Sequence, residues 1–287
     1  MNQINSHNEL IQLIARLAQE SPTYEKFAIY IENNYLDIVF LTAEEVAKKA
    51  NISQGSVSRF CKDLGYRGYN DFARSLQGVF RTELTAPQRL KYNVTDSPGV
   101  TEEILVTEIR NIESLSNILG TDEFSKMVDF VAKVDTLYFL SARMPATIIP
   151  YAAYILSKFR DNVRVAEPGT TEWNTLYLQN VENTGIVVYG FPRYATELVN
   201  KVKELKQLGF RIHLITDSNF CPMVDDCENI IQVSITSSSV FDIYSTPVLF
   251  TNLLLKEVSK KIPQIDERIR KIEEYEKNNE IYYSFKR

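Results

Sequence analysis

Residues 41–65 read LTAEEVAKKANISQGSVSRFCKDLG, and their spacing predicts two short helices that cross through a tight turn. Thr42 and Glu45 have the three-residue spacing of a capping box at the start of the first helix. Asn51 stands where the chain must turn, and asparagine tolerates the left-handed backbone that such a turn requires. Ser53 then caps the second helix. Together these features form a helix-turn-helix pattern, for which an ordinary hairpin in an all-α domain is the alternative.

Apolar and small side chains of this segment stand where they would pack the two helices together. They are Val46, Ala47, Ala50, Ile52, Val57 and Phe60. The small residues among them let the two backbones approach closely. We expect Cys61 to fill space in the same core rather than to act as a nucleophile.

If Val57 and Phe60 face inward, the polar side chains of the second helix remain outside, near its N-terminal part. A recognition helix uses that part to contact base edges in the major groove of DNA. Arg59 can pair with guanine and Gln54 with adenine through two hydrogen bonds each. The residues expected at DNA are Ser53, Gln54, Gly55, Ser56, Ser58, Arg59, Lys62 and Arg67.

Gly55 is unusual inside a helix, where glycine costs about 1 kcal/mol relative to alanine. Either it admits close approach of DNA, or it lies so near the first turn that its cost is small. Basic residues at the end of the second helix and beyond it would contact phosphates and make binding salt-dependent. These are Lys62, Arg67, Arg74 and Arg81. A solvated surface is the alternative for each of them.

The charge of the chain is unevenly distributed. The 287 residues carry a formal net charge of −5, yet residues 46–82 contain seven basic and two acidic residues. The overall acidity excludes a protein that coats nucleic acid, whereas the basic block indicates an anionic partner. The length, with 44% hydrophobic and 24% charged residues, indicates two folded domains.

Other classes of protein are disfavoured by what the sequence contains. Cys61, Cys221 and Cys227 include no CxxC pair, which argues against a zinc ribbon and against a disulfide framework. The two histidines, His7 and His213, are far apart, so we expect no metal and no cofactor. The N-terminus lacks a signal-peptide pattern and no apolar run approaches 18 residues, so we expect a cytoplasmic protein without a membrane segment.

From residue 121 on, short apolar runs alternate with helical patterns, which predicts a parallel sheet with helices on both faces. The expected strands are 137–140, 162–166, 185–189, 211–216 and 230–233. The expected helices lie near 122–133, 146–159, 194–208 and 246–261. The fold class is therefore α plus α/β. We predict an all-α helix-turn-helix domain over 1–82, a linker over 83–100, and a three-layer α/β/α domain with a five-stranded parallel sheet over 101–287.

Two further helices border this domain. A stripe of Leu105, Ile109, Ile112, Ser116 and Leu119 predicts a helix that Gly120 stops. Residues 264–279 predict a charged helix with isoleucines on one face. That face either caps the domain or meets a partner.

Residues 41–76 resemble the helix-turn-helix of MurR/RpiR-type bacterial transcriptional regulators. The resemblance rests on Val57-Ser58-Arg59-Phe60, Leu64-Gly65-Tyr66 and Gly68-Tyr69-Asn70-Asp71-Phe72. The second domain is similar to the sugar isomerase (SIS) domain of those regulators, on Leu214-Ile215-Thr216-Asp217-Ser218 and Pro222. The resemblance implies a homodimer or homotetramer that binds a double-stranded, near-palindromic operator. It also implies that the second domain senses a sugar phosphate and that carbohydrate genes are controlled.

The chain departs from that family where the sugar phosphate binds. SIS domains use a Gly-x-Gly-x-Ser-like turn after the first strand and a Ser-x-Ser-Gly-x-Thr turn after the third. Here the turns read Ser141-Ala142-Arg143-Met144-Pro145 and Gly190-Phe191-Pro192-Arg193-Tyr194-Ala195. Arginines stand where glycines are expected, and each proline removes one backbone donor.

Three interpretations of these turns remain open. The site has lost its ligand and the domain only dimerises, or the guanidinium groups of Arg143 and Arg193 replace the hydroxyls, or the ligand carries no phosphate. The residues expected at a ligand are Ser141, Arg143, Gly190, Arg193, Tyr194 and Thr196, with Thr147, Thr170, Thr171 and residues 237–239 as supplements. Glu172 and Glu197 are conceivable bases for a sugar-phosphate isomerase, and His213 is expected within a strand. Because no acid can be paired with a base, we expect no enzyme.

Overall fold

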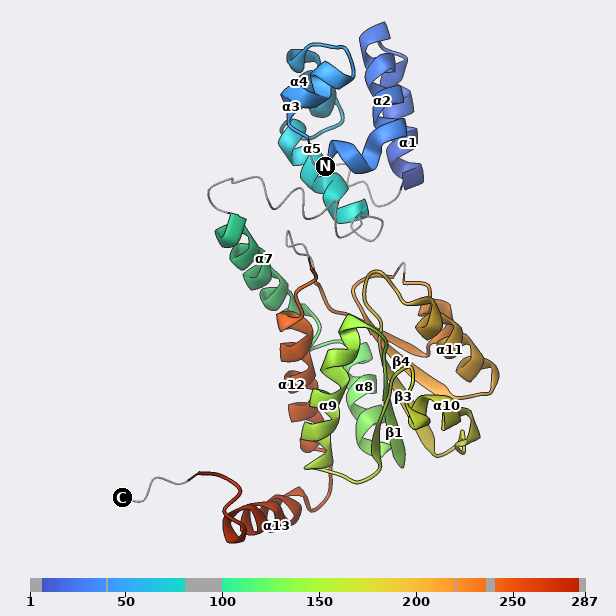
Figure 1. Ribbon diagram of the computed structural model, residues 1–287, viewed down its shortest axis with the longest axis vertical. Coiled ribbons are helices and arrows are strands. Elements are labelled where there is room, and N and C mark those ends of the chain that lie inside the picture. The colour runs from blue at the N-terminus through green and yellow to red at the C-terminus, as the bar shows by residue number, and fades with distance from the viewer. Residues whose placement is uncertain (1–6, 40, 81–99, 220, 236–240, 284–287) are drawn as a thin grey trace. The chain divides into compact units, whose positions relative to one another are not determined.

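The computed structural model describes residues 7–39, 41–80, 100–219, 221–235 and 241–283 (Figure 1). The chain divides into two compact units, the first containing α1 to α5 and the second α7 to α13. The expected linker falls almost wholly on residues 81–99, which lie outside the described residues. Each unit is described by itself.

The first unit is built from helices around a single apolar core. Its helices are α1 (His7–Ala18), α2 (Pro22–Ile38), α3 (Ala43–Lys49), α4 (Gln54–Asp63) and α5 (Tyr69–Phe80). Phe60 of α4 is fully buried, and its ring meets those of Tyr24 and Phe27 edge-on, with centroids 5.0 and 4.9 Å away. Such edge-to-face pairs add to the free energy gained by burying the rings. Phe60 thereby anchors α4 on α2.

The turn between α3 and α4 has the local geometry that the sequence predicts. Thr42 and Glu45 form the capping box, with both reciprocal hydrogen bonds present. Asn51 has a φ of 54°, the left-handed conformation expected of it. The Oγ of Ser53 accepts the backbone N–H of Ser56 at 3.1 Å and so caps α4. Val46, Ala47, Val57, Phe60 and Cys61 are buried, and Ala50 and Ile52 pack half-buried against them.

The second unit contains a five-stranded parallel sheet in the order β2-β1-β3-β4-β5. Its strands are β1 (Thr136–Leu140), β2 (Val163–Ala166), β3 (Thr184–Tyr189), β4 (Arg211–Thr216) and β5 (Asn229–Gln232). Leu140 pairs with Ala166 on one side and Val188 on the other, so the carboxyl ends of these strands share one edge. The predicted five-stranded parallel sheet is confirmed.

Helices cover both faces of the sheet, as Figure 1 shows. One face packs on α8 (Asp122–Lys133), α9 (Ile148–Ser157) and α12 (Ser245–Ser259), and the other on α10 (Thr171–Thr175) and α11 (Thr196–Gln207). In β3, Val187 and Tyr189 enter the first core, while Ile186 and Val188 enter the second. This alternation follows from the two-residue period of a strand, and it makes the predicted three-layer architecture.

Three boundaries differ from those expected from the sequence. The helix expected from 146 starts with a 3-10 turn (Met144–Thr147) before α9. Residues 171–175 form the short helix α10, which was not among the expected helices, and the Oγ1 of Thr170 caps it at the N–H of Trp173. The helix expected to run to Gly120 ends at Ser114, and a 3-10 turn (Leu115–Asn117) follows.

Helix α7 (Val100–Ser114) places its polar residues toward the domain and its apolar stripe outward. Glu108 and Asn111 are buried, and the Oγ of Ser245 donates to the Glu108 carboxylate. Leu105 and Ile109 are 60% and 47% exposed. The stripe predicted a helix but not which way its apolar side faces. The part-buried hydrogen bond between Ser245 and Glu108 holds the polar side of α7 against the domain.

The last helix, α13 (Ile265–Asn278), has no fully buried residue among its fourteen. Arg268 attaches it to the end of α9 by a 2.8 Å ion pair with Asp161 and a 3.0 Å hydrogen bond to the carbonyl of Ser157. Its isoleucines are half-buried. None of the helices in the described part of the chain is long and apolar enough to cross a membrane.

Candidate functional site

The exposed side of α4 brings together most of the residues that the sequence assigns to DNA. Gln54, Gly55, Arg59 and Lys62 are exposed, and Ser56 and Ser58 are half-buried. Ser53 is exposed as well, but its hydroxyl lies 2.8 Å from that of Ser56. The long side chains of this surface, rather than its serine hydroxyls, therefore have the greater freedom to reach a partner.

Gly55 is not required by packing inside the first unit. A Cβ built at this position would meet only the Oγ of Ser53, at 3.7 Å, which is an ordinary contact. Its φ is not in the left-handed region either. Neither the backbone conformation nor the neighbouring side chains therefore require a glycine at this position, which is the second residue of α4.

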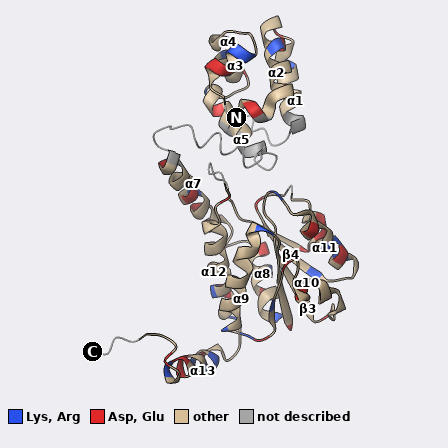
Figure 2. Cartoon of the chain, in the orientation of Figure 1, with Lys and Arg blue, Asp and Glu red and all other residues tan. Residues whose placement is uncertain are grey.

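Basic side chains flank α4 on neighbouring segments. Lys48 and Lys49 are exposed at the end of α3, and Arg67 is exposed after α4; Figure 2 colours these basic residues blue. The side chain of Arg74 and the whole of Arg81 lie outside the described residues. The carboxylate of Asp63, at the end of α4, accepts the hydroxyl of Tyr24 at 2.5 Å.

A second candidate site lies in the α/β unit, at the carboxyl ends of β1 and β3. Ligands of open parallel sheets bind outside this edge. A cavity of about 280 Å³ is lined there by Ala142, Arg143, Met144, Pro145, Phe191, Pro192, Arg193, Ala195, Leu198, Asp242 and Tyr244. Two arginines and the buried Asp242 thus meet walls that are otherwise largely apolar and aromatic.

Both arginines of this pocket have backbone conformations that favour glycine. Arg143 has φ 63° and ψ −142°, a region that essentially only glycine occupies without strain. Arg193 has φ 60°. The backbone therefore keeps glycine-like turns although the residues are arginine. Glycines are expected at these two positions of the SIS motifs, and the turn geometry gives the physical reason for that expectation.

The other residues expected at the ligand have structural roles. The hydroxyl of Ser141 is fully buried and donates to the carbonyl of Tyr189 at 2.7 Å. Gly190 lies against Met223, whose Cε would be 2.3 Å from an added Cβ. Thr196 is exposed at the start of α11 but does not line the pocket. Ser141 and Gly190 thus build the floor of the turn instead of facing the cavity.

Tyr194 turns away from the pocket toward β4. Its hydroxyl donates to the Oδ1 of Asp217 at 2.7 Å. Burial, followed by the neighbouring carboxylate of Asp217, raises the pKa of this phenol. The supplementary residues Thr170 and Thr171 belong to the start of α10, Thr147 bonds the carbonyl of Met144, and residues 237–239 lie outside the described residues.

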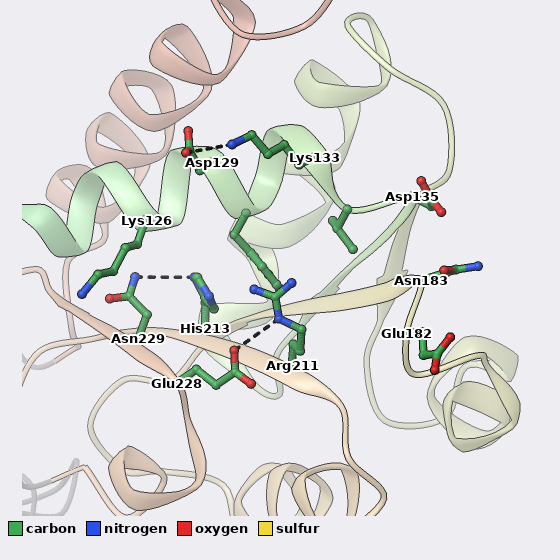
Figure 3. Close-up of a pocket in the computed structure, with 12 residues that line it drawn as sticks. Lys126, Asp129, Lys133, Asp135, Glu182, Asn183, Arg211, His213, Glu228 and Asn229 are labelled. Carbon is green, nitrogen blue, oxygen red and sulfur yellow. Dashed lines mark hydrogen bonds and ion pairs between the residues drawn. The ribbon is translucent and has the colours of Figure 1, made fainter.

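A larger polar pocket, of about 500 Å³, lies at the opposite, amino-terminal edge of the sheet (Figure 3). Four of its charged side chains form ion pairs, Asp129 with Lys133 at 3.0 Å and Glu228 with Arg211 at 3.3 Å. His213 stands in its wall, within β4 as expected. Because of these internal ion pairs and its place at the amino-terminal edge of the sheet, this pocket is the weaker candidate for a ligand site.

The described residues contain no group of three or more His, Cys, Asp or Glu side chains that could hold a metal ion. Cys61 is buried in the core of the first unit, and burial raises the pKa of its thiol to about 12. A thiol with this pKa stays protonated and unreactive.

Comparison with known protein families gives a match in the first unit. Residues 8–83 match the profile described as the helix-turn-helix domain of the rpiR family. The chain carries an rpiR-family helix-turn-helix domain. The match spans α1 to α5, so all five helices of the first unit belong to this domain.

Two curated proteins that are similar to this chain are named as transcriptional regulators. The HTH-type transcriptional regulator CPE0189 of Clostridium perfringens is 21% identical, over 81% of this chain and 87% of its own length. YbbH of Bacillus subtilis, also named an HTH-type transcriptional regulator, is 25% identical over 42% of each chain. The similarity to CPE0189 therefore extends well beyond the rpiR-family domain.

Two solved structures share the fold. The sugar isomerase domain of an RpiR transcription factor from Sphaerobacter thermophilus covers 61% of this chain and 99% of its own, at 14% identity and a TM-score of 0.57. NanR of Vibrio vulnificus, solved in complex with ManNAc-6P, covers 92% and 98% respectively, at 15% identity and a TM-score of 0.55. The α/β unit thus has the SIS fold, and the fold class predicted from the sequence is confirmed.

Sequence reasoning missed three residues at the SIS pocket. Asp242 and Tyr244 line it from the segment before α12, and Glu197 reaches it from α11. Glu197 was considered only as a base, whereas its carboxylate lies 3.3 Å from the Nε of Arg143. No local pattern could reveal these partners, because they meet only when distant segments fold together.

Proposed function

We propose that this chain is a sequence-specific DNA-binding transcriptional regulator whose SIS-fold unit takes a small anionic ligand. One observation carries the proposal: α4 of an rpiR-family domain presents Gln54, Gly55 and Arg59 to solvent. Glutamine and arginine are residue types that read base edges in the major groove. Genomic DNA, which for bacteria such as the relatives above lies in the cytoplasm, is the partner.

The roles at DNA follow from side-chain chemistry. Arg59 can form a bidentate pair with the O6 and N7 of guanine, and Gln54 with the N6 and N7 of adenine. Ser53, Ser56 and Ser58 contact phosphates or bases at the start of the helix. Lys62 and Arg67 bind phosphates and set the salt dependence of binding.

The proposed effector is an anion such as a sugar phosphate, bound between Arg143 and Arg193. Support comes from the position of the pocket at the carboxyl edge of the sheet, and from NanR, which shares the fold and was solved with ManNAc-6P. Guanidinium groups bind phosphate in a fixed, forked geometry. By this analogy the regulated genes serve carbohydrate uptake or metabolism. Loss of the ligand, leaving a domain that only dimerises, is the alternative.

A homodimer is the assembly that fits the outward stripe of α7, and a tetramer would pair two such dimers. Leu105, Ile109 and Ile112 repeat at intervals of four and three residues, the spacing of a helix–helix seam. Exposed apolar patches of this kind mark interaction surfaces. A two-fold dimer would place two α4 helices about one DNA turn apart, roughly 34 Å.

An isomerase is the less favoured function. Moving a proton beside a carbonyl requires a positioned base with a suitable pKa. Glu197 is paired with Arg143, Glu172 belongs to the short helix α10, and His213 lies at the other edge of the sheet. The relatives named as transcriptional regulators also favour a regulator.

A gel-shift experiment tests the function. The DNA upstream of the gene is incubated with wild type, with Arg59→Ala, and with Arg16→Ala, which removes an exposed arginine of α1 as a charge control. We expect Arg59→Ala to lose about 1–3 kcal/mol of specific binding, a five- to 150-fold effect. Equal binding by all three proteins, with no preference over scrambled DNA, would overturn the proposal.

A further inference from the structure

The two arginines of the SIS pocket differ in their partners. The Nε of Arg143 lies 3.3 Å from the Oε1 of Glu197. Within the described parts of the chain, the guanidinium of Arg193 has no ion-pair or hydrogen-bond partner. Arg143 is thus already neutralised by a carboxylate of the protein, while Arg193 is not.

The carboxylate of Glu197 occupies a place suited to an anion. Glu197 is the second residue of α11, a twelve-residue helix whose N-cap, Ala195, offers no side-chain hydrogen bond. Negative charge is stabilised in the first turn of a helix by the unpaired backbone N–H groups and the helix dipole. A guanidinium on one side and a helix N-terminus on the other are what an anionic ligand of this pocket would also use.

We infer that Glu197 is a built-in competitor for the ligand anion, which a bound ligand must displace from Arg143. The inference rests on the proposed function, because it requires that an anion binds between Arg143 and Arg193. An anion that bridges the two guanidinium groups exchanges the internal Arg143–Glu197 pair for its own contacts. Without ligand, the Arg143–Glu197 ion pair connects the turn after β1 to the start of α11. With ligand, the anion connects the turn after β1 to the turn after β3.

The exposure of the pair limits the size of the effect. The side chains of Arg143 and Glu197 are 78% and 42% exposed, and exposed ion pairs are weak because water screens them. Glu197 consequently reduces the affinity for an anion by about two- to fivefold without blocking the site. It also disfavours singly charged anions that engage only one arginine, since these gain less than they displace.

The experiment measures binding of inorganic phosphate to the full chain by calorimetry. Glu197→Gln removes the competing charge and keeps the size of the side chain. Glu204→Gln is the matched control. Glu204 lies on the same helix, its carboxylate is 2.9 Å from the Nζ of Lys201, and neither residue lines the pocket. Arg193→Ala tests the site itself. Arg143→Ala, alone and combined with Glu197→Gln, completes a double-mutant cycle.

We expect Glu197→Gln to bind phosphate about two- to fivefold more tightly than wild type, with Glu204→Gln unchanged. Glu197→Gln should bring no tightening in the Arg143→Ala background, and Arg193→Ala should lose binding. Equal affinities of wild type and Glu197→Gln would overturn the competitor but leave the anion site standing. If Glu197→Gln tightens phosphate binding by the same factor in the Arg143→Ala background as in wild type, the effect is one of general charge. That result would also overturn the role of Glu197 as a competitor and leave the anion site standing. No phosphate binding by any of the proteins would overturn the anion site as well.

Discussion

The imidazole of His213 lies flat against the phenyl ring of Phe130, with ring centroids 3.8 Å apart and an angle of 11° between the planes. The histidine is buried, and its Nδ1 lies 3.5 Å from the Nδ2 of Asn229 (Figure 3). Since that Nδ2 group can only donate, the contact requires a neutral ring with Nδ1 unprotonated. Burial, followed by the charge of Arg211, lowers the pKa of His213 to about 4.

This histidine should make the α/β unit sensitive to mild acid. The folded pKa of about 4 lies below the unfolded value of 6.5, so between these values the unfolded chain binds more protons. The stabilising contribution is complete above pH 6.5 and is lost as the pH falls toward 4. Urea unfolding followed by the fluorescence of Trp173, the single tryptophan, should show about 2 kcal/mol less stability at pH 5 than at pH 7.5. His213→Gln should remove most of that difference. An unchanged pH dependence in His213→Gln would rule out His213 as its source.

At position 143, glycine should give a more stable protein than alanine, the reverse of the usual order. At φ 63° and ψ −142° any Cβ is strained by about 1–3 kcal/mol, which alanine retains and glycine relieves. We expect Arg143→Gly to be about 1 kcal/mol more stable than Arg143→Ala in the same Trp173 assay. Arg164, exposed in β2, is the control, because there glycine should be the less stable by about 0.5–1 kcal/mol. The same ranking at both positions would contradict a strained turn.

Gly55→Ala should separate stability from DNA binding. An added Cβ has room beside Ser53, so the first unit should be unchanged or up to about 1 kcal/mol more stable. If DNA approaches α4 closely at Gly55, the same methyl group should weaken binding at least tenfold in fluorescence anisotropy. Ser58→Ala, also on α4, measures the loss of a hydroxyl without added bulk. Full DNA affinity in Gly55→Ala would show that no close approach occurs there.

Ile109→Glu should dissociate the dimer. The substitution places a charge in the middle of the outward stripe of α7, where Ile109 is 47% exposed in the single chain. Sedimentation velocity should give a dimer for wild type and a monomer for Ile109→Glu. Arg110→Glu, on the next and also exposed position of α7, should remain a dimer. A dimeric Ile109→Glu protein would place the interface elsewhere.

The helix-turn-helix and the sheet could be predicted because their signals are local. Thr42, Glu45 and Asn51 fix the caps and the turn within a few residues of themselves, and the alternating runs reflect burial on both faces of a sheet. The orientation of α7 could not be predicted, since it depends on a contact between Ser245 and Glu108 across 137 positions. A helical stripe shows that an apolar face exists but not whether the chain itself covers it.

The candidate pocket lies at the edge of the sheet where the sequence places the two turns, but only some of the residues expected at a ligand line it. The two turns could be located from strand order, and Arg143 and Arg193 do line the pocket. Ser141 was expected to face a ligand, yet its hydroxyl bonds the carbonyl of Tyr189, 48 positions away. Gly190 lies against the side chains of Met223 and Leu214. Both roles depend on neighbouring strands and loops that a motif does not reveal.

Selection of DNA from a random duplex pool tests most directly whether α4 reads sequence. Wild-type protein and Arg59→Ala are taken through the same rounds of binding and sequencing, with Arg16→Ala as the charge control. We predict that wild type and Arg16→Ala enrich one near-palindromic motif with half-sites about one helical turn apart. We also predict that Arg59→Ala loses the preference for a guanine in each half-site. Enrichment of no motif by wild type, or of an identical motif by Arg59→Ala, would contradict the account.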